Sequence, residues 1–220
     1  NFSEAAFVGR LNADLANDLG NLVSRTITMA IKYCDGKVPE VGSKERSSVL
    51  REAALKAVSD VETGFEDMSL HKALMAIWEY INITNKYIVE NEPWTLGKDP
   101  ANREKPTVIM YNLLVALQEI AVLISPFMPQ TAEKILHQIG AGESRHLDLA
   151  GIKAGSVLKA GSSLMRGDSL FPRISQEQEP PMPEKRIPAV DLKPQIEYEE
   201  FDKVDLRVAR ILAAEPVPKS

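Results

Sequence analysis

Apolar residues recur every three or four positions along most of the first 140 residues, the spacing of helices with one buried side. In the first run, from about Ser3 to Tyr33, they are Val8, Leu11, Leu15, Leu19, Leu22, Val23, Ile27 and Ala30. Similar runs predict helices over about 43–63, 69–90 and 104–124, and QTAEKILHQIG predicts a short fifth helix ending at Gly140. The pattern therefore predicts a mainly α fold, with a bundle of about five helices over residues 1–140.

The run over 104–124 differs from the others because it is apolar on nearly every side, in VIMYNLLVALQEIAVLI. A helix of this kind is typical of the centre of a bundle. Pro106 is compatible with it, since proline is tolerated in the first turn of a helix. We expect this helix to form the middle of the core.

Beyond Gly140 the chain changes character. Glycines separate short apolar pieces over 141–174, which predicts an extension packing on the bundle as a small hairpin. Residues 175–196 are rich in proline and acidic residues and predict an extended linker. Residues 197–220 predict a helical turn followed by an alternating strand, without enough chain to bury it.

The composition indicates an ordinary globular protein but says little about its function. The 220 residues are 44% hydrophobic and 26% charged, without a sustained apolar run long enough to predict a membrane span. The net charge of -5 means that an anionic partner would have to be held by a local group of residues. Cys34 is the only cysteine and the three histidines are widely spaced, so we expect no disulfide, no metal site and a reducing, cytoplasmic setting.

A row of polar residues stands out in NADLANDLGNLVSR. At about 100° per residue, Asn17, Asn21 and Arg25 fall together on the side opposite the leucines; we call these three the polar row. Asparagine is a mediocre helix former, whereas amides suit base edges and a guanidinium suits bases and phosphate. The alternative is an ordinary solvated helix face, or an amide bonded to a neighbouring element.

Trp94 is the second unusual residue, because it lies behind Pro93 in the polar sequence ENEPWTLGKD. A tryptophan there either folds down as a lid on the core or points outward to stack on a planar ligand such as an unpaired base. Trp78, in contrast, lies on the apolar side of its predicted helix, which indicates a core residue.

Several motifs together resemble the C-terminal half of the methionyl-tRNA synthetase family, which are class I aminoacyl-tRNA synthetases. They are NADLANDLGNLVSR, NKYIVENEPW, ISPFMPQTAEKI and LFPRI, in the family's order over about residues 7–174. The closing FDKVDLRVARILAAEPVPKS resembles the start of the oligonucleotide-binding (OB) fold module that many bacterial members carry, where it helps bind tRNA and dimerise. The resemblance implies an anticodon-binding bundle followed by a truncated module.

The resemblance also implies roles for individual residues. Asn21 and Arg25, with Asn17 beside them, would read the CAU anticodon of tRNA-Met, and Trp94 would stack on an anticodon base. The family's HIGH-like and KMSKS-like motifs, which bind ATP, do not occur in this sequence. We therefore expect a fragment without catalytic residues or cofactors of its own, taken from a methionine–tRNA ligase whose missing catalytic domain uses ATP and, in some members, zinc.

Two other functions remain open from the sequence. A helical bundle can be a scaffold that docks only proteins, which predicts no RNA affinity above a salt-sensitive background. Alternatively the chain is the anticodon domain of another class I synthetase, since NLVSR is loosely shared, although its pairing with NEPW favours methionine.

Overall fold

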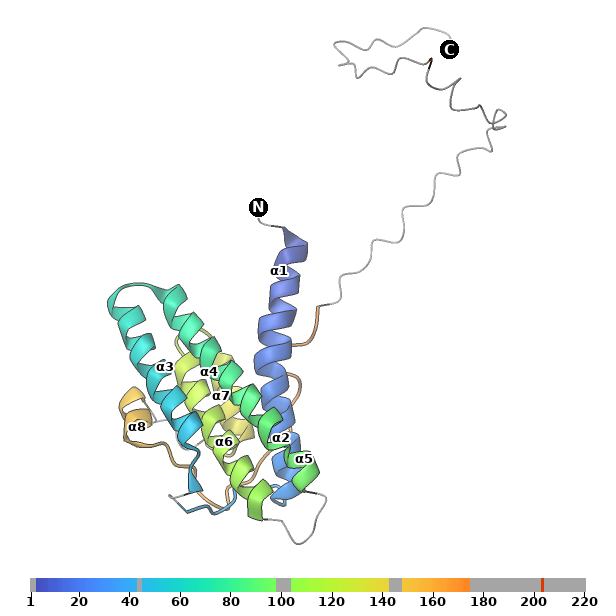
Figure 1. Cartoon of the computed structure of the whole chain (residues 1–220), viewed down its shortest axis with the longest axis vertical. Helices are drawn as coiled ribbons and strands as arrows, with labels where there is room; N and C mark the ends of the chain where they lie inside the picture. The colour runs from blue at the N-terminus through green and yellow to red at the C-terminus, as the bar shows by residue number, and fades with distance from the viewer. Residues whose placement is uncertain (1–2, 43–44, 98–103, 143–147, 175–202, 204–220) are drawn as a thin grey trace. The chain divides into compact units, whose positions relative to one another are not determined.

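The computed structural model describes residues 3–42, 45–97, 104–142, 148–174 and 203. The predicted linker (175–196) and the predicted module (197–220) lie outside the described residues, apart from Lys203. The chain divides after Gln176 into two units, and the first contains all the described helices. As Figure 1 shows, these helices form a bundle, which confirms the predicted mainly α fold.

The first predicted helix is continuous but changes type along its length. It runs as α1 (Glu4–Arg10), a π-helix η1 (Leu11–Gly20) and α2 (Asn21–Tyr33). The junction residues Arg10 and Gly20 keep helical backbone angles, so the three pieces form one rod (Figure 1). Because a π-helix bonds each residue to the fifth one along, the 100° spacing assumed for the polar row does not hold before Asn21.

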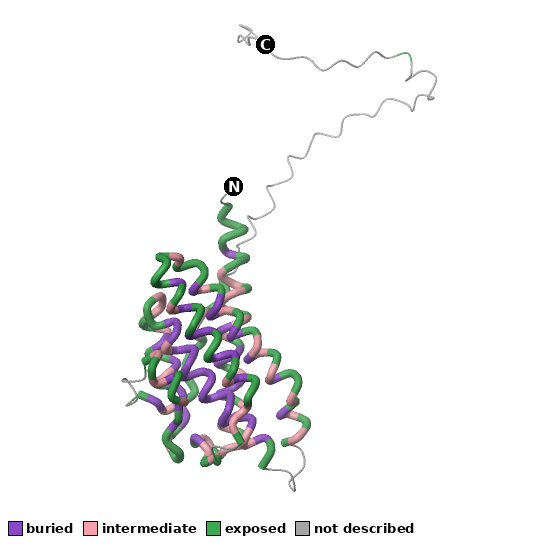
Figure 2. The backbone as a smooth tube through the Cα atoms, turned by 60° about the vertical axis from the view of Figure 1, so that its left-hand side comes forward, coloured by how far each residue is buried: buried purple, intermediate pink, exposed green. Residues whose placement is uncertain are grey.

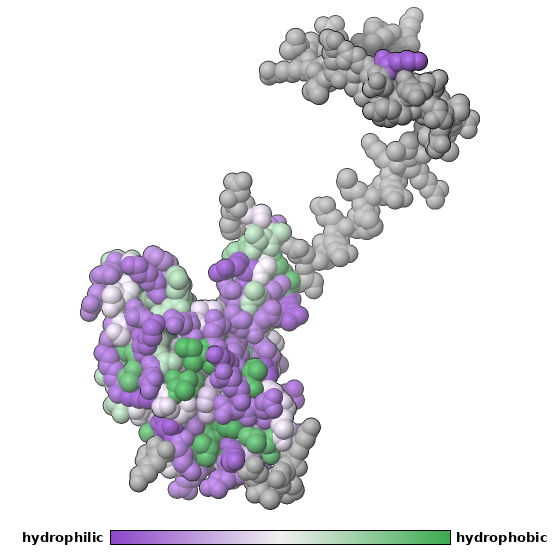
Figure 3. All heavy atoms as spheres, viewed as in Figure 1, coloured by the Kyte–Doolittle hydropathy of each residue, from purple (hydrophilic) through white to green (hydrophobic). Residues whose placement is uncertain are grey.

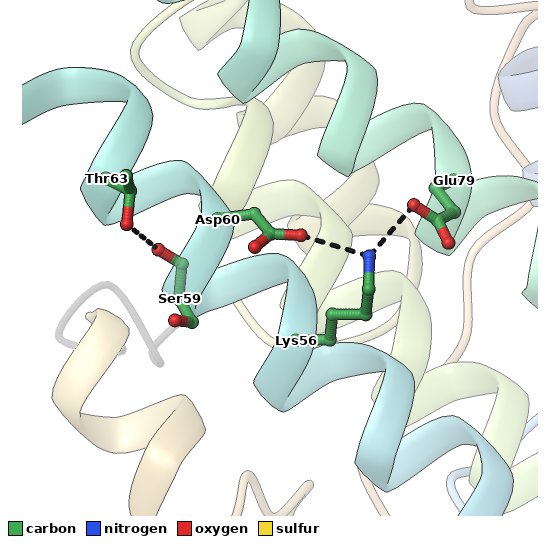
Figure 4. A network of polar contacts seen from close by, with 5 residues as sticks. All are labelled: Lys56, Ser59, Asp60, Thr63 and Glu79. Carbon is green, nitrogen blue, oxygen red and sulfur yellow. Dashed lines mark hydrogen bonds and ion pairs between the residues drawn. The ribbon is translucent and has the colours of Figure 1, made fainter. Parts of the chain in front are cut away.

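Helices α3 (Ser48–Glu66) and α4 (Leu70–Asn91) form a tight antiparallel pair. A Cβ added at Gly64 would lie 3.0 Å from the Cβ and the amide nitrogen of Ala73, so the two backbones touch where the pair turns. On the exposed side, the Lys56 ammonium lies 3.1 Å from both Asp60 and Glu79 and joins the two helices (Figure 4).

Helix α6 (Glu104–Ile124) supplies the centre of the core, as predicted. Its length and hydropathy would suit a membrane span, but 83% of an 18-residue apolar stretch within it is buried inside the bundle. Figure 2 shows the buried stretches of the chain facing inward from the surrounding helices. The apolar character of α6 therefore belongs to a core helix, which packs against α2, α3, α4 and α7 (Pro129–Gln138).

The extension over 148–174 packs on the bundle but not as the predicted hairpin. It contains a short helix, α8 (Leu149–Ala154), and then an extended chain that forms a single β-bridge, from Ser163 to Lys37. The Val38 amide donates to the Ser162 carbonyl and the Leu164 amide to the Gly36 carbonyl, so the partner is the chain after α2. Gly161 lies in a turn, whereas Gly151 lies inside α8, and the pairing partner of Ser163 is more than a hundred residues away.

The face of the bundle shown in Figure 3 is mainly hydrophilic, with hydrophobic patches among the polar residues. The N-terminal helix α1 is the least buried, and of its residues only Val8 is classed as buried. The core accordingly lies among α2, α3, α4, α6 and α7.

Candidate nucleic-acid interface

Asn21 and Arg25 lie one turn apart at the start of α2, where the backbone is an ordinary α-helix. Leu22, Val23 and Ile27 turn into the core and fix the rotation of the helix. Asn21 is exposed, and its side chain forms no hydrogen bond with the described residues. Its amide therefore keeps both donor and acceptor capacity for a ligand.

Trp94 lies on α5 (Pro93–Leu96), a single helical turn in the segment that the sequence analysis treated as a loop. The chain enters α5 through Glu92, whose φ of 38° makes a left-handed corner after α4. Pro93 is buried at the first position of the turn, where its missing N–H costs nothing. Trp94 follows directly and is partly buried against the core.

The structure brings Arg25 and Trp94 together. The guanidinium carbon of Arg25 lies 5.7 Å from the centroid of the Trp94 ring, within the range of a cation–π contact. Such a contact contributes about 0.5–1 kcal/mol at exposed sites, so it orients both groups without holding them rigidly. Arg25 has no carboxylate partner within the described chain, which leaves its donors available.

Asn17 is exposed, but it takes part in a contact that the sequence analysis did not predict. Its amide oxygen accepts a hydrogen bond of 2.6 Å from the Arg173 guanidinium. Asn12, five residues earlier, accepts from the Ile174 amide and donates to the Ile174 carbonyl, both at 3.0 Å. Phe171 packs 3.4 Å from the position that a Cβ would take at Gly20.

The segment 171–174 is therefore attached along the π-helix by Asn12, Asn17 and Gly20. Asn17 and Arg25 are not equivalent members of the polar row, because the Asn17 amide oxygen already accepts a hydrogen bond from Arg173. LFPRI was recognised as a family motif, but nothing in its residue types pointed to η1. The one signal that could have indicated a π-helix is the five-residue spacing of Asn12 and Asn17, which matches the hydrogen-bond step of such a helix.

Two acidic residues, Asp14 and Asp18, lie on the same continuous helix as the polar row. Asp14 pairs with Arg10 at 3.0 Å. Burial, with the charge of Asp14 as a smaller cause, raises the pKa of Asp18. Together they limit the positive potential around Asn17, so affinity for a polyanion would depend on specific contacts more than on net charge.

The described residues do not point to covalent or metal chemistry. Burial raises the pKa of the Cys34 thiol to about 11, so the thiolate, which is the nucleophilic form, is scarce at neutral pH. Within the described ranges, no group of three or more histidine, cysteine, aspartate or glutamate side chains could hold a metal ion. What the arrangement offers is an indole, a guanidinium and an amide on adjoining elements, which suits a planar, polar ligand.

The domain family described as the anticodon binding domain of methionyl tRNA ligase matches residues 38–186 of this chain. That is more than half of its length. The chain belongs to the methionyl-tRNA synthetase family. The match includes Trp94 but begins after the polar row, so similarity around Asn17, Asn21 and Arg25 comes from whole-chain relatives.

Two curated methionine–tRNA ligases are similar over the entire chain. The one from Caldanaerobacter subterraneus subsp. tengcongensis is 42% identical and the one from Bacillus subtilis 37%, each covering 100% of this chain. A solved structure of Mycobacterium tuberculosis methionyl-tRNA synthetase in its free state covers 79% of the chain with a TM-score of 0.69 and 33% identity. The chain spans about 35% of the length of each of these proteins.

Proposed function

We propose that this chain recognises the CAU anticodon of tRNA-Met as the anticodon-binding part of a methionine–tRNA ligase. In this proposal Arg25 and Asn21 read base edges, and Trp94 stacks on an anticodon base. Stacking tolerates every base because each has a π face, whereas a guanidinium or an amide pairs with a particular donor and acceptor pattern. Arg25 therefore discriminates among bases and Trp94 holds the loop.

The observation that supports this proposal best is the pairing of Arg25 with Trp94 at 5.7 Å, across two elements nearly seventy residues apart. A reading group beside a stacking group is the minimum that an unpaired base requires. Since the guanidinium already lies near the indole, a base must stack on the remaining indole surface or against the guanidinium itself. Asn17 has a smaller part here, because Arg173 takes its amide oxygen.

For the whole protein, the proposed reaction joins L-methionine to tRNA-Met with ATP, through methionyl-adenylate. One related structure from M. tuberculosis is described in complex with methionyl-adenylate. No chemical step is assigned to this chain. Its contribution is selection of the tRNA, and binding far from the chemistry raises the rate only if it is realised in the transition state.

The proposed partners are tRNA-Met and the protein's own catalytic domain, in the cytoplasm. A homodimer formed through the complete C-terminal module is part of the same proposal. Family membership disfavours a scaffold that docks only proteins and another class I synthetase.

The proposal is tested by measuring the Kd of the 220-residue chain for an anticodon stem-loop of tRNA-Met and for the same loop with CAU replaced, at two salt concentrations. Phosphate contacts weaken with salt equally for both loops, because counterion release does not depend on sequence. We expect a gap of about 1–3 kcal/mol per lost base contact that persists at both salts. Lys56→Ala, on the exposed face of α3 and α4, removes one charge away from the site and should preserve the gap.

Equal affinity for both loops at both salts would mean that this bundle does not read the anticodon. A gap that disappears at the higher salt would also contradict the proposal, because base contacts should survive screening.

A further inference from the structure

Helix α5 is too short to hold its own position. It has four residues, and one turn of helix is unstable alone because nucleation costs more than a single hydrogen bond returns. The place of Trp94 must therefore come from the attachments of α5 to the rest of the bundle. Glu92 and the buried Pro93 attach its beginning, as described above.

Its end is attached through Gly97. The φ of Gly97 is −73°, which any residue can adopt, so a glycine is not needed there for conformation. The requirement is for space: a Cβ at this position would overlap Cε1 of Tyr33 and lie 2.8 Å from its Cζ. The backbone of Gly97 therefore rests directly against the Tyr33 ring.

Tyr33 is the last residue of α2, the helix that carries Arg25 two turns earlier. The ring is partly buried against the core, and the Lys32 ammonium lies 5.3 Å from its centroid. Helix α2 thus meets α5 twice, through Arg25 at Trp94 and through Tyr33 at Gly97. Figure 1 shows α5 beside this part of α2.

We propose that Tyr33 and Gly97 are positioning residues for Trp94, which set the distance of its indole from Arg25 without touching the RNA. The consequence for RNA rests on the proposed function, whereas the position of the indole can be measured without RNA. A side chain at Gly97 would push α5 away from α2, and loss of the Tyr33 ring would leave α5 unsupported.

The experiment uses the full chain with Trp78→Phe, so that Trp94 is the one remaining tryptophan. Acrylamide quenching of its fluorescence reports how exposed Trp94 is in the free protein. The variants are Gly97→Ala, Tyr33→Leu and Tyr33→Phe, each checked by thermal unfolding. Gly9→Ala is the matched control, because a Cβ there meets nothing within 4 Å.

We expect Gly97→Ala and Tyr33→Leu to change the quenching of Trp94 and to weaken CAU stem-loop binding at least about fivefold, as partial loss of one stacked base would. Tyr33→Phe and Gly9→Ala should match the parent in both measurements. Unchanged quenching and binding in Gly97→Ala would overturn the proposal. Tyr33→Phe weakening RNA binding as much as Tyr33→Leu would also overturn it, because the hydroxyl would then be an RNA contact.

The two proposals fail separately. If the parent does not prefer the CAU loop but Gly97→Ala alters Trp94 quenching, the anticodon assignment is wrong and the positioning contact stands. If the parent prefers the CAU loop but Gly97→Ala leaves Trp94 quenching unchanged, the positioning contact is wrong and the anticodon assignment stands.

Discussion

In the proposed interface, Trp94 holds a base by stacking, whereas Arg25 and Asn21 identify it. We expect Trp94→Leu to weaken binding of the CAU stem-loop and of the altered loop by similar amounts, about 1–3 kcal/mol, because stacking does not depend on base identity. Trp94→Phe should recover much of the loss. Isothermal titration with both loops measures this, and a loss confined to the CAU loop would show that the indole itself discriminates.

Glu119 is the residue whose chemistry is least expected in its place, in the middle of α6 with 2% of its surface exposed. Its Oε2 accepts a hydrogen bond of 2.6 Å from the Tyr80 hydroxyl. Burial raises the pKa of the carboxyl, while the hydrogen bond from Tyr80 and the charges of Arg46 and Arg51 lower it by less. Glu119 therefore binds its proton more tightly in the folded state than in the unfolded state.

The pH dependence follows from that direction. With a pKa raised on folding, Glu119 makes the folded state bind more protons than the unfolded state, so the free energy of unfolding falls as pH rises above the ordinary glutamate range. Glu119→Gln keeps an acceptor for Tyr80 and removes the ionisation. We expect it to flatten the loss of stability as pH rises above the ordinary glutamate range, measured by urea unfolding. The exposed Glu79→Gln is the control, and an equal slope in wild type and Glu119→Gln would contradict the assignment.

At the scale of elements, the α3–α4 pair depends on a close contact. Gly64→Ala places a methyl group 3.0 Å from two atoms of Ala73, so we expect it to destabilise the fold by about 1–3 kcal/mol through overpacking. Chemical denaturation measures this against Gly9→Ala, which should be neutral or slightly stabilising. A stable Gly64→Ala would mean that the helices separate at little cost.

The π-helix and the segment 171–174 form the second element-scale contact. Asn12→Ala removes both hydrogen bonds to the Ile174 backbone, so the segment should leave η1 more often and trypsin should cleave faster after Arg173. Asn91→Ala is the control, since within the described part of the chain its amide donates to the Tyr87 carbonyl of α4 itself. Equal cleavage rates in the two variants would mean that Asn12 does not hold the segment.

The spacing of apolar residues predicted the main helices, because burial in the core determines which of their positions are apolar. The helix over 104–124 was predicted with the bounds that the structure has, and helices α3, α4 and α7 within a few residues. The π-helix over Leu11–Gly20 was not predicted, because the apolar spacing was assigned the 100° step of an α-helix. The hairpin over 141–174 was wrong, because Ser163 forms its bridge with Lys37, which is far away in the sequence.

The sequence proposes residues for the candidate site but not how they are arranged in space. Asn21 lies exposed on the predicted side of the helix, and Trp94 was recognised as out of place in a polar segment. Their neighbours depend on how α5 packs against α2. That packing is set by the close fit of Gly97 against the Tyr33 ring, which the spacing of apolar residues cannot predict. Arg173 gave no signal, because a single arginine after a proline is common in surface segments.

For the whole molecule, the net charge of -5 means that RNA binding has to come from a few placed groups. In our proposal, Arg25 is the group on which discrimination depends. The most direct measurement is the difference in binding free energy between the CAU stem-loop and the altered loop, for wild type, Arg25→Lys and Arg25→Ala at two salt concentrations. Lysine keeps the charge but loses the planar, paired donors of the guanidinium.

The account predicts that wild type keeps a gap of about 1–3 kcal/mol at both salts, and that Arg25→Ala and Arg25→Lys both lose most of it. Arg25→Lys should nevertheless retain the salt-dependent part of the affinity, because that part depends on charge. A full gap in Arg25→Ala, or a gap that Arg25→Lys restores completely, would contradict the assignment of anticodon reading to this guanidinium.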